Sequence, residues 1–122
     1  MFGAILGDII GGSCAMISHG PETWHPDPEF FYKYGGGPMM DMGPYYVTAL
    51  INLLGGVKSV YGTSHTTYSE RLITAKPHEG EIIKVNVPTH YECIMNFDCG
   101  VSISYVTSFD TLNPNMPHVL LY

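Results

Sequence analysis

The clearest pattern in the chain is an apolar stripe within Met39–Leu54. Its residues recur at the i, i+3, i+4, i+7 spacing of one helix face, and they are Val47, Leu50, Ile51 and Leu54. The pair Gly55–Gly56 follows at once, as glycine commonly does at a helix C-terminus. Pro44 suits a first helical turn but would clash with a preceding turn if the helix began near Pro38. The pattern predicts a helix over Met39–Leu54. Its N-terminal boundary is fixed only to within several residues.

Other stretches carry the β-branched and aromatic residues, or the apolar alternation, that are typical of strands. They are Ile9–Ser18, Val57–Ser69, Ile82–Val87, Tyr91–Phe97, Val101–Phe109 and His118–Tyr122. Lys76–Gly80 reads as a turn, and Pro88 ends the third stretch. The tip Asp98–Gly100 indicates a hairpin in which Gly100 takes a positive φ.

One helix followed by successive strands predicts an α+β fold, with an open, mostly antiparallel β-sheet and one main helix packed on one face. Short turns join the strands, so no parallel crossover is required. The length of 122 residues fits one domain. Because the chain stops within a strand pattern, we expect residues 1–122 to form a single, partial domain whose sheet is unfinished at its C-terminal edge.

The segment Gly20–Gly37 precedes the predicted helix and has no helix or strand pattern. It contains three prolines and ends in three consecutive glycines. Loops longer than about 12–15 residues are usually functional or disordered. This loop also carries aromatic residues, which disordered segments lack, and they are Trp24, Phe30, Phe31, Tyr32 and Tyr34. We therefore expect an ordered, functional loop.

The low charge of the chain excludes several kinds of partner. Charged residues make up 13% of the sequence and the net charge is −6. No Lys/Arg cluster provides the basic face that nucleic acid or an anionic membrane surface requires. No segment reaches the roughly 20 apolar residues of a membrane span. The apolar opening Met1–Ile10 lacks the basic region of a signal peptide, since the first basic residue is Lys33. We expect a cytoplasmic protein.

The cysteines and histidines do not indicate a metal site. Cys14, Cys93 and Cys99 form no Cys-x-x-Cys pair, and their odd number argues against a disulfide framework. Reduced thiols are the expectation. The remaining histidines without an assigned role lack metal-ligand spacing, and they are His65, His78, His90 and His118.

The predicted helix also has a polar face. At 100° per residue, four polar side chains fall within about 60° of one another and roughly 140° from the apolar stripe, and they are Asp41, Tyr45, Thr48 and Asn52. Asp41 and Tyr45 are one turn apart, close enough to share a substrate oxygen. A polar helix face is most often simply solvated, yet such a face usually carries Lys, Glu or Arg, and this one has a single charge. It is either a solvated surface or the wall of a site.

These segments resemble the signature of the Gfo/Idh/MocA family of oxidoreductases. Trp24–Pro28 followed by Gly35–Tyr45 is similar to the family's Trp-containing loop and its motif Gly-Gly-Gly-x-x-x-Asp-x-Gly-x-His (or Tyr). The resemblance continues over nearly the whole chain, in a helix that ends with Leu-Leu-Gly before a strand and in a central hairpin. The residues that carry it there are Leu53–Val60, Pro88–His90, Phe97–Gly100 and Thr107–Phe109.

The resemblance implies the substrate-side domain of an NAD(P)-dependent oxidoreductase that acts on the hydroxyl of a sugar, polyol or related compound. Asp41 matches the motif's aspartate, and Tyr45 takes the position usually held by a histidine that handles the proton of the reacting hydroxyl. Removing hydride from a carbinol carbon requires loss of that proton, so a positioned base helps. A free phenol has a pKa of about 10 and needs a nearby cation to act near neutrality. In the family that cation is a lysine of a Glu-Lys-Pro motif on the other domain; here Ala75–Pro77 is only superficially similar and lies in the predicted turn.

The candidate substrate-binding residues are Trp24, His25, His19 and Thr48. Aromatic faces stack on the C–H surfaces of sugars, and imidazole supplies hydrogen bonds. Trp24 could equally be a packing anchor for the long loop. Asp110 and Asn113 follow the hairpin and could reach the same cleft.

The chain contains no candidate cofactor-binding residue. A Rossmann fingerprint needs Gly-x-Gly-x-x-Gly between a strand and a helix, and no glycines here have that spacing. We expect NAD or NADP only in a full-length enzyme, held by a Rossmann domain that is missing from this chain. The resemblance further implies a homo-oligomer that forms through the open sheet face, which suits the low charge.

Two alternatives stay open. The first is a stand-alone, non-catalytic domain that binds sugars or dimerises. The second follows from Gly3–Asp8, which resembles the opening of ADP-ribosylglycohydrolases, although their magnesium-binding Thr-Asp-Asp-Thr-like motif is absent. In the oxidoreductase interpretation, Gly7–Gly11 is instead a turn into the first strand.

Overall fold

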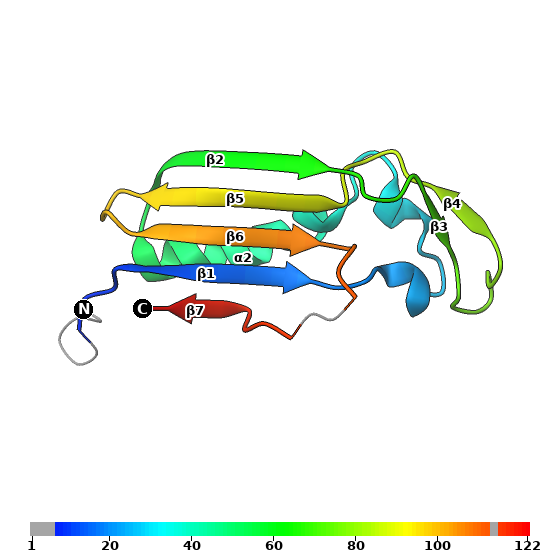
Figure 1. The fold of residues 1–122 in the computed structure, drawn as a ribbon, viewed down its shortest axis with the longest axis horizontal. Helices are drawn as coiled ribbons and strands as arrows, with labels where there is room; N and C mark the ends of the chain where they lie inside the picture. Colours follow the sequence, from blue (N-terminus) through cyan, green and yellow to red (C-terminus); the bar gives the residue numbers. More distant parts are fainter. Residues whose placement is uncertain (1–6, 113–114) are drawn as a thin grey trace.

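The structure, a computed structural model, describes residues 7–112 and 115–122. Within these ranges a main sheet, a small second sheet and a single α-helix form the fold (Figure 1). The strands are β1 (Gly11–Ile17), β2 (Val57–His65), β3 (Glu70–Leu72), β4 (Ile82–Lys84), β5 (His90–Phe97), β6 (Ser102–Ser108) and β7 (Val119–Leu121). The α-helix is α2 (Pro38–Leu54), and two short 3-10 helices, η1 (Pro21–Thr23) and η2 (Glu29–Tyr32), lie in the preceding loop.

The main sheet has the strand order β2-β5-β6-β1-β7, and β3 pairs with β4 in a separate hairpin. All neighbours in the main sheet are antiparallel except β1 and β6, which pair in parallel from Gly11 with Ser102 to Ile17 with Ser108. The predicted α+β class, with an open and mostly antiparallel sheet, is confirmed. The parallel pair was not expected. It arises because β1 and β6 are far apart along the chain, and the intervening α2 and loops supply the long connection that parallel strands need.

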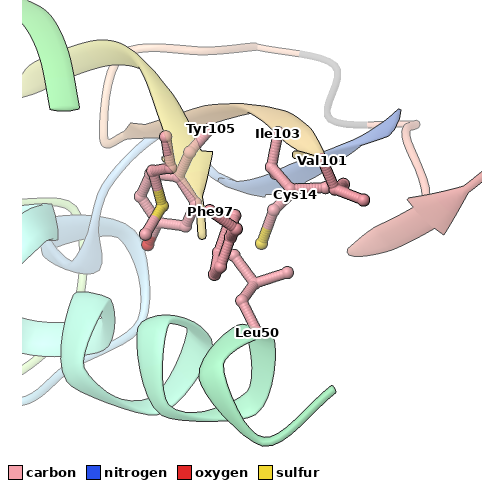
Figure 2. Close-up of a cluster of buried hydrophobic side chains, with 7 residues drawn as sticks. Cys14, Leu50, Phe97, Val101, Ile103 and Tyr105 are labelled. Atoms are coloured by element: carbon pink, nitrogen blue, oxygen red, sulfur yellow. The ribbon is translucent and has the colours of Figure 1, made fainter. Parts of the chain in front are cut away.

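Helix α2 covers one face of the main sheet and packs on β6, β5 and β1 (Figure 1). Figure 2 shows Leu50 pointing from α2 toward the buried side chains of the sheet, among them Cys14 and Phe97. Val47 and Leu54 pack against the same core, as the stripe predicts. Ile51, however, is 41% exposed. Residue 51 lies 100° around the helix from Leu50, so Met39, Tyr46 and the buried Gly43 complete the contact face instead.

The helix begins at Pro38, which places Pro44 inside it rather than in its first turn. Proline has no N–H, so the carbonyl of Met40 receives no helical hydrogen bond from residue 44. Pro44 is exposed, and its ring points away from the sheet core. Gly37 sets the start of the helix. Its φ of 94° is a conformation that glycine adopts readily, and its N–H donates to the carbonyl of Phe31 at 2.6 Å.

The predicted strands are found, and five of the six have shorter bounds than predicted. The stretch Val57–Ser69 becomes β2, which stops at His65, and Ile82–Val87 contains β4, which stops at Lys84. The hairpin is confirmed, and Gly100 has a φ of 94° at its tip. Strand β7 forms the edge of the main sheet beside β1.

The face of the sheet opposite α2 carries no helix in the described part of the chain. One cross-strand row on this open face runs from β2 to β7, and it consists of Tyr61, Ile94, Ser104, Ser13 and Leu120. Tyr61 is 68% exposed, Ile94 47% and Leu120 48%. A shallow depression of about 440 Å³ lies over this row. The open face is therefore a partly apolar surface.

A second, smaller core lies at the end of the sheet where β1 and β6 finish. It joins the 20–37 loop to the β3–β4 hairpin through five buried residues, Phe31, Tyr32, Ile73, Ile83 and Phe109. Among the described residues, no helix has the length and apolar character needed to cross a bilayer. Cys14, Cys93 and Cys99 are free thiols, and burial raises the pKa of Cys14 to about 11.

Candidate active site

The loop between β1 and α2 is ordered, as its aromatic content predicts. Helices η1 and η2 shape it, and both Phe31 and Tyr32 are buried against the second core. The Phe31 ring stacks on Phe30 with centroids 4.2 Å apart, and His25 meets it edge-on at 5.1 Å. Since this packing holds the loop from inside, its exposed rings stand in defined positions beside the helix.

The three glycines before α2 let the chain fold back beneath η2. A Cβ on Gly36 would lie 2.5 Å from the carbonyl oxygen of Phe30 and 2.6 Å from that of Phe31, so no side chain fits there. Gly37 then turns the chain into α2, and the Asp41 N–H closes the first helical turn on the Gly37 carbonyl at 3.0 Å. The motif therefore delivers Asp41 to the edge of the aromatic cluster.

Asp41 lines two neighbouring pockets. The inner pocket, of about 380 Å³, is bounded by Met16, Trp24, Phe31, Asp41, Met42 and Phe109 among others. The outer pocket, of about 360 Å³, is bounded by Phe30, Phe31, Tyr34, Gly35, Met40 and Asp41 among others. Burial raises the pKa of Asp41, and no hydrogen bond within the described residues offsets that effect. Its carboxylate is therefore an available acceptor between two pockets with aromatic walls.

Tyr45 and Thr48 lie farther along the exposed side of α2. Tyr45 is 69% exposed, one turn from Asp41, and lines neither pocket. Thr48 is also exposed and lines neither pocket. The predicted polar face of the helix is thus a solvent-facing surface in this chain. Of the polar residues on that face, Asp41 is the one that borders the two pockets. The catalytic role of Tyr45 stays a prediction.

The predicted sugar-binding residues divide between two places. Trp24 is 66% exposed and forms one side of the inner pocket. His25 packs beside it with ring centroids 5.4 Å apart, and its Nδ1 accepts a hydrogen bond from the Asp27 N–H at 2.9 Å. His19 instead lines a third pocket of about 240 Å³ with Tyr68, Arg71 and Asp110. The structure does not bring His19 together with Trp24 at the inner pocket.

A buried ionic network underlies the third pocket, and the sequence interpretation missed its centre. Arg71, from β3, donates through Nε to Glu22 at 2.7 Å and through Nη1 to Asp110 at 2.6 Å. The Tyr32 hydroxyl donates to the other Glu22 oxygen, and burial together with this bond raises the pKa of Tyr32. The Thr89 hydroxyl donates to Asp110 at 2.7 Å.

This network changes the expected role of Asp110. Its carboxylate is held by Arg71 and Thr89, so it is a tether for the loop rather than a free group at the inner pocket. Asn113 lies outside the described residues. One feature of the sequence could have pointed to the network: Arg71 is the only arginine, and it lies in a short amphipathic strand.

Comparison with known proteins identifies the domain. Residues 4–121 match the family model of the GFO/IDH/MocA C-terminal domain. The chain belongs to the GFO/IDH/MocA family. Because the match includes most of the opening segment, Gly3–Asp8 is better explained as the start of this domain than as a fragment of a hydrolase. No match was found among proteins with a curated description.

Solved structures share the fold of this GFO/IDH/MocA domain. Levoglucosan dehydrogenase in complex with NADH and L-sorbose is 21% identical with a TM-score of 0.66, over 89% of this chain and 29% of that one. An NAD-binding oxidoreductase from Klebsiella pneumoniae is 19% identical with a TM-score of 0.69, over 93% and 30%. The transcriptional regulator Gal80p from Kluyveromyces lactis is 13% identical with a TM-score of 0.72, over 95% and 30%. The chain thus spans about 30% of the length of these relatives.

Proposed function

We propose that this domain forms the substrate side of an NAD(P)-dependent oxidoreductase that acts on the hydroxyl of a sugar, polyol or related compound. One observation carries the proposal: the carboxylate of Asp41, which has no side-chain hydrogen bond or ion pair within residues 7–112 and 115–122, lies at the border of two pockets with aromatic walls. Sugar recognition combines ring stacking with hydrogen bonds to a charged acceptor. The levoglucosan dehydrogenase that shares the fold binds L-sorbose together with NADH, which supports the same class of ligand.

The residues of this chain do not fit a dinucleotide. Of the three glycines before α2, Gly36 lies against the carbonyl groups of Phe30 and Phe31, and Gly37 lies against the carbonyl group of Pro88, so the backbone at these two positions faces the chain itself rather than a pyrophosphate. The Rossmann glycine spacing is also absent. NAD or NADP would therefore be held by another domain, and the contribution of this chain is confined to the substrate and its proton.

Two side chains carry that contribution in the proposal. Asp41 accepts a hydrogen bond from a substrate hydroxyl and orients it. Tyr45, one helical turn further along the exposed side of α2, exchanges the hydroxyl proton once the second domain closes over this face. Trp24 and His25 form the aromatic wall against which the substrate rests, while Thr48 and His19 are proposed to contact more distant parts of it.

The proposal is tested by sugar binding to the chain itself. Trp24 is the only tryptophan, so its fluorescence reports directly on the inner pocket. Titration with D-glucose, sorbitol and myo-inositol should change that fluorescence in the wild type. Asp41→Asn should weaken binding about 10–100-fold, because a charged hydrogen bond contributes about 1.5–3 kcal/mol. Binding should also weaken as the pH falls through the raised pKa of Asp41, where the carboxylate gains a proton.

The matched control is Asp98→Asn, which removes an exposed carboxylate at the distant hairpin tip. It should leave sugar affinity unchanged. Wild-type affinity in Asp41→Asn would remove Asp41 from the site. In a full-length protein that contains this domain, Tyr45→Phe should lower kcat about 100-fold or more while KM changes little.

A non-catalytic sugar-binding domain is the second candidate. The exposure of Tyr45 away from both pockets favours it, since a binding protein needs Asp41 and Trp24 but no base. The two candidates differ in one result: sugar binding without any NAD(P)-dependent oxidation in the full-length protein supports the second.

For either candidate we propose a cytoplasmic protein that self-associates through the open sheet face.

A further inference from the structure

The inner and outer pockets share one wall. Phe31 and Asp41 line both, whereas Trp24 belongs only to the inner pocket and Tyr34 only to the outer one. A ligand held by the Asp41 carboxylate therefore has an aromatic surface available on each side of it. We propose that the substrate carries two ring-sized units, as a disaccharide or an aryl glycoside does, with one ring in each pocket. This inference rests on the proposed function and specifies its substrate class.

The shared wall is rigid, so the two pockets do not merge into one. Phe31 is only 8% exposed. Its ring packs between Phe30 at 4.2 Å and Phe109 at 6.2 Å. Its backbone is held at both ends, because its N–H donates to the Pro28 carbonyl at 3.2 Å and its own carbonyl accepts from Gly37 at 2.6 Å. A ligand must pass over this wall, at the level of Asp41, to fill both pockets.

Each pocket has room for at least one ring. The volumes of about 380 Å³ and about 360 Å³ lie at the lower end of the roughly 300–1,000 Å³ range of small-molecule sites. A single hexose would occupy one pocket and leave the aromatic surface of the other exposed to water. Two linked rings would cover both.

The exposed aromatic side chains are distributed between the pockets in the same way. Trp24, 66% exposed, provides a stacking surface in the inner pocket. Tyr34, 100% exposed, and Phe30, 57% exposed, provide surfaces in the outer pocket. Tyr34 makes no ring contact within the described residues, so its position is not explained by packing of the chain itself. The two oxygens of Asp41 can accept hydroxyls from both rings, because an ionised carboxylate offers about four acceptor sites.

The test compares one-ring and two-ring ligands by titration calorimetry on the chain. The one-ring probes are D-glucose, D-galactose and myo-inositol, and the two-ring probes are cellobiose, maltose, lactose and phenyl β-D-glucoside. At least one two-ring probe should bind about ten-fold more tightly than its one-ring parent, as an added stacked ring contributes about 1.4 kcal/mol. Tyr34→Ala should reduce the affinity for that two-ring probe to the affinity for its one-ring parent. The affinity for the parent should not change.

The control variant is Tyr122→Ala, which removes another exposed tyrosine, 67% exposed, that lines neither pocket; this substitution should change neither affinity. Equal affinity of all one-ring and two-ring probes, with no effect of Tyr34→Ala, would overturn the two-ring inference while sparing the proposed function. Binding of NADH that is lost in Tyr34→Ala would overturn it too, because the outer pocket would then hold the cofactor ring. If no probe of either kind binds, the proposed function fails with it.

Discussion

Arg71 shows how much one residue contributes to the candidate site. Its side chain is 5% exposed, and it connects the 20–37 loop through Glu22 to the end of β6 through Asp110. Its guanidinium also lies 5.0 Å from the ring centre of Tyr32. Two buried carboxylates depend on this one cation. A buried ion pair is weak support for net stability, but loss of one partner leaves uncompensated charge behind.

We predict that Arg71→Met destabilises the chain by about 3–5 kcal/mol, because Glu22 and Asp110 would stay buried without a counter-ion. Urea unfolding followed by circular dichroism measures the free energy of unfolding. Lys58→Met, at an exposed position on β2, is the control and should change it by less than about 0.5 kcal/mol. A loss below about 1 kcal/mol for Arg71→Met would show that the network does not hold the loop.

At the scale of elements, the site depends on how the ends of β1 and β6 meet the loop. The parallel pairing of these strands brings Ser18 and Phe109 to the same end of the sheet, where the Ser18 N–H donates to the Ser108 carbonyl at 2.9 Å. Strand β1 is also held on its other side by β7. The close approach of β7 is possible because residue 12 is glycine: a Cβ there would lie 2.4 Å from the Leu120 carbonyl oxygen.

We predict that Gly12→Ala detaches β7 and destabilises the chain by about 1–3 kcal/mol, the usual cost of overpacking. Native-state hydrogen exchange should show lost protection at the Ala15 N–H, which donates to His118, and at the Tyr122 N–H, which donates to Gly11. Gly56→Ala is the matched control, since its new methyl would meet only the flexible end of Asp98. Unchanged protection in Gly12→Ala would mean that β7 tolerates displacement.

At the scale of the whole molecule, the two faces of the main sheet differ in how they are covered. Helix α2 covers one face, and the open face leaves Tyr61, Ile94 and Leu120 exposed in a single row. Apolar surfaces of this kind mark interaction sites in soluble proteins. Because the pockets beside Asp41 lie toward the helix side of the sheet, self-association through the open face would leave them accessible.

We predict that the chain self-associates through this face and that Ile94→Lys makes it monomeric, since a charge would be buried at the centre of the contact. Sedimentation velocity over a range of concentrations measures the mass. Ile82→Lys is the control: Ile82 is similarly exposed, at 55%, but lies on the separate β3–β4 hairpin. A wild-type chain that is monomeric at high concentration would contradict the prediction, as would equal effects of the two substitutions.

Local patterns determined the elements of this protein. The apolar spacing of α2, the glycines that flank it and the hairpin tip at Gly100 depend on residues within a few positions of one another, and each is found where the pattern places it, except that Ile51 of the stripe is exposed. The family resemblance likewise rests on short segments of sequence, foremost Trp24–Pro28 and Gly35–Tyr45, and the family match confirms it. Helix geometry alone also established that Asp41 and Tyr45 share one side of α2.

Only the tertiary structure decided which of these residues meet. The parallel β1–β6 pair, the Arg71 network and the two pockets beside Asp41 all join segments that are distant in sequence, so no local pattern contains them. A helical projection gives the direction of Asp41 and Tyr45 around the axis but not what stands opposite them. The packed loop supplies walls at Asp41 and leaves Tyr45 in solvent, because η2 reaches only the first turn of the helix.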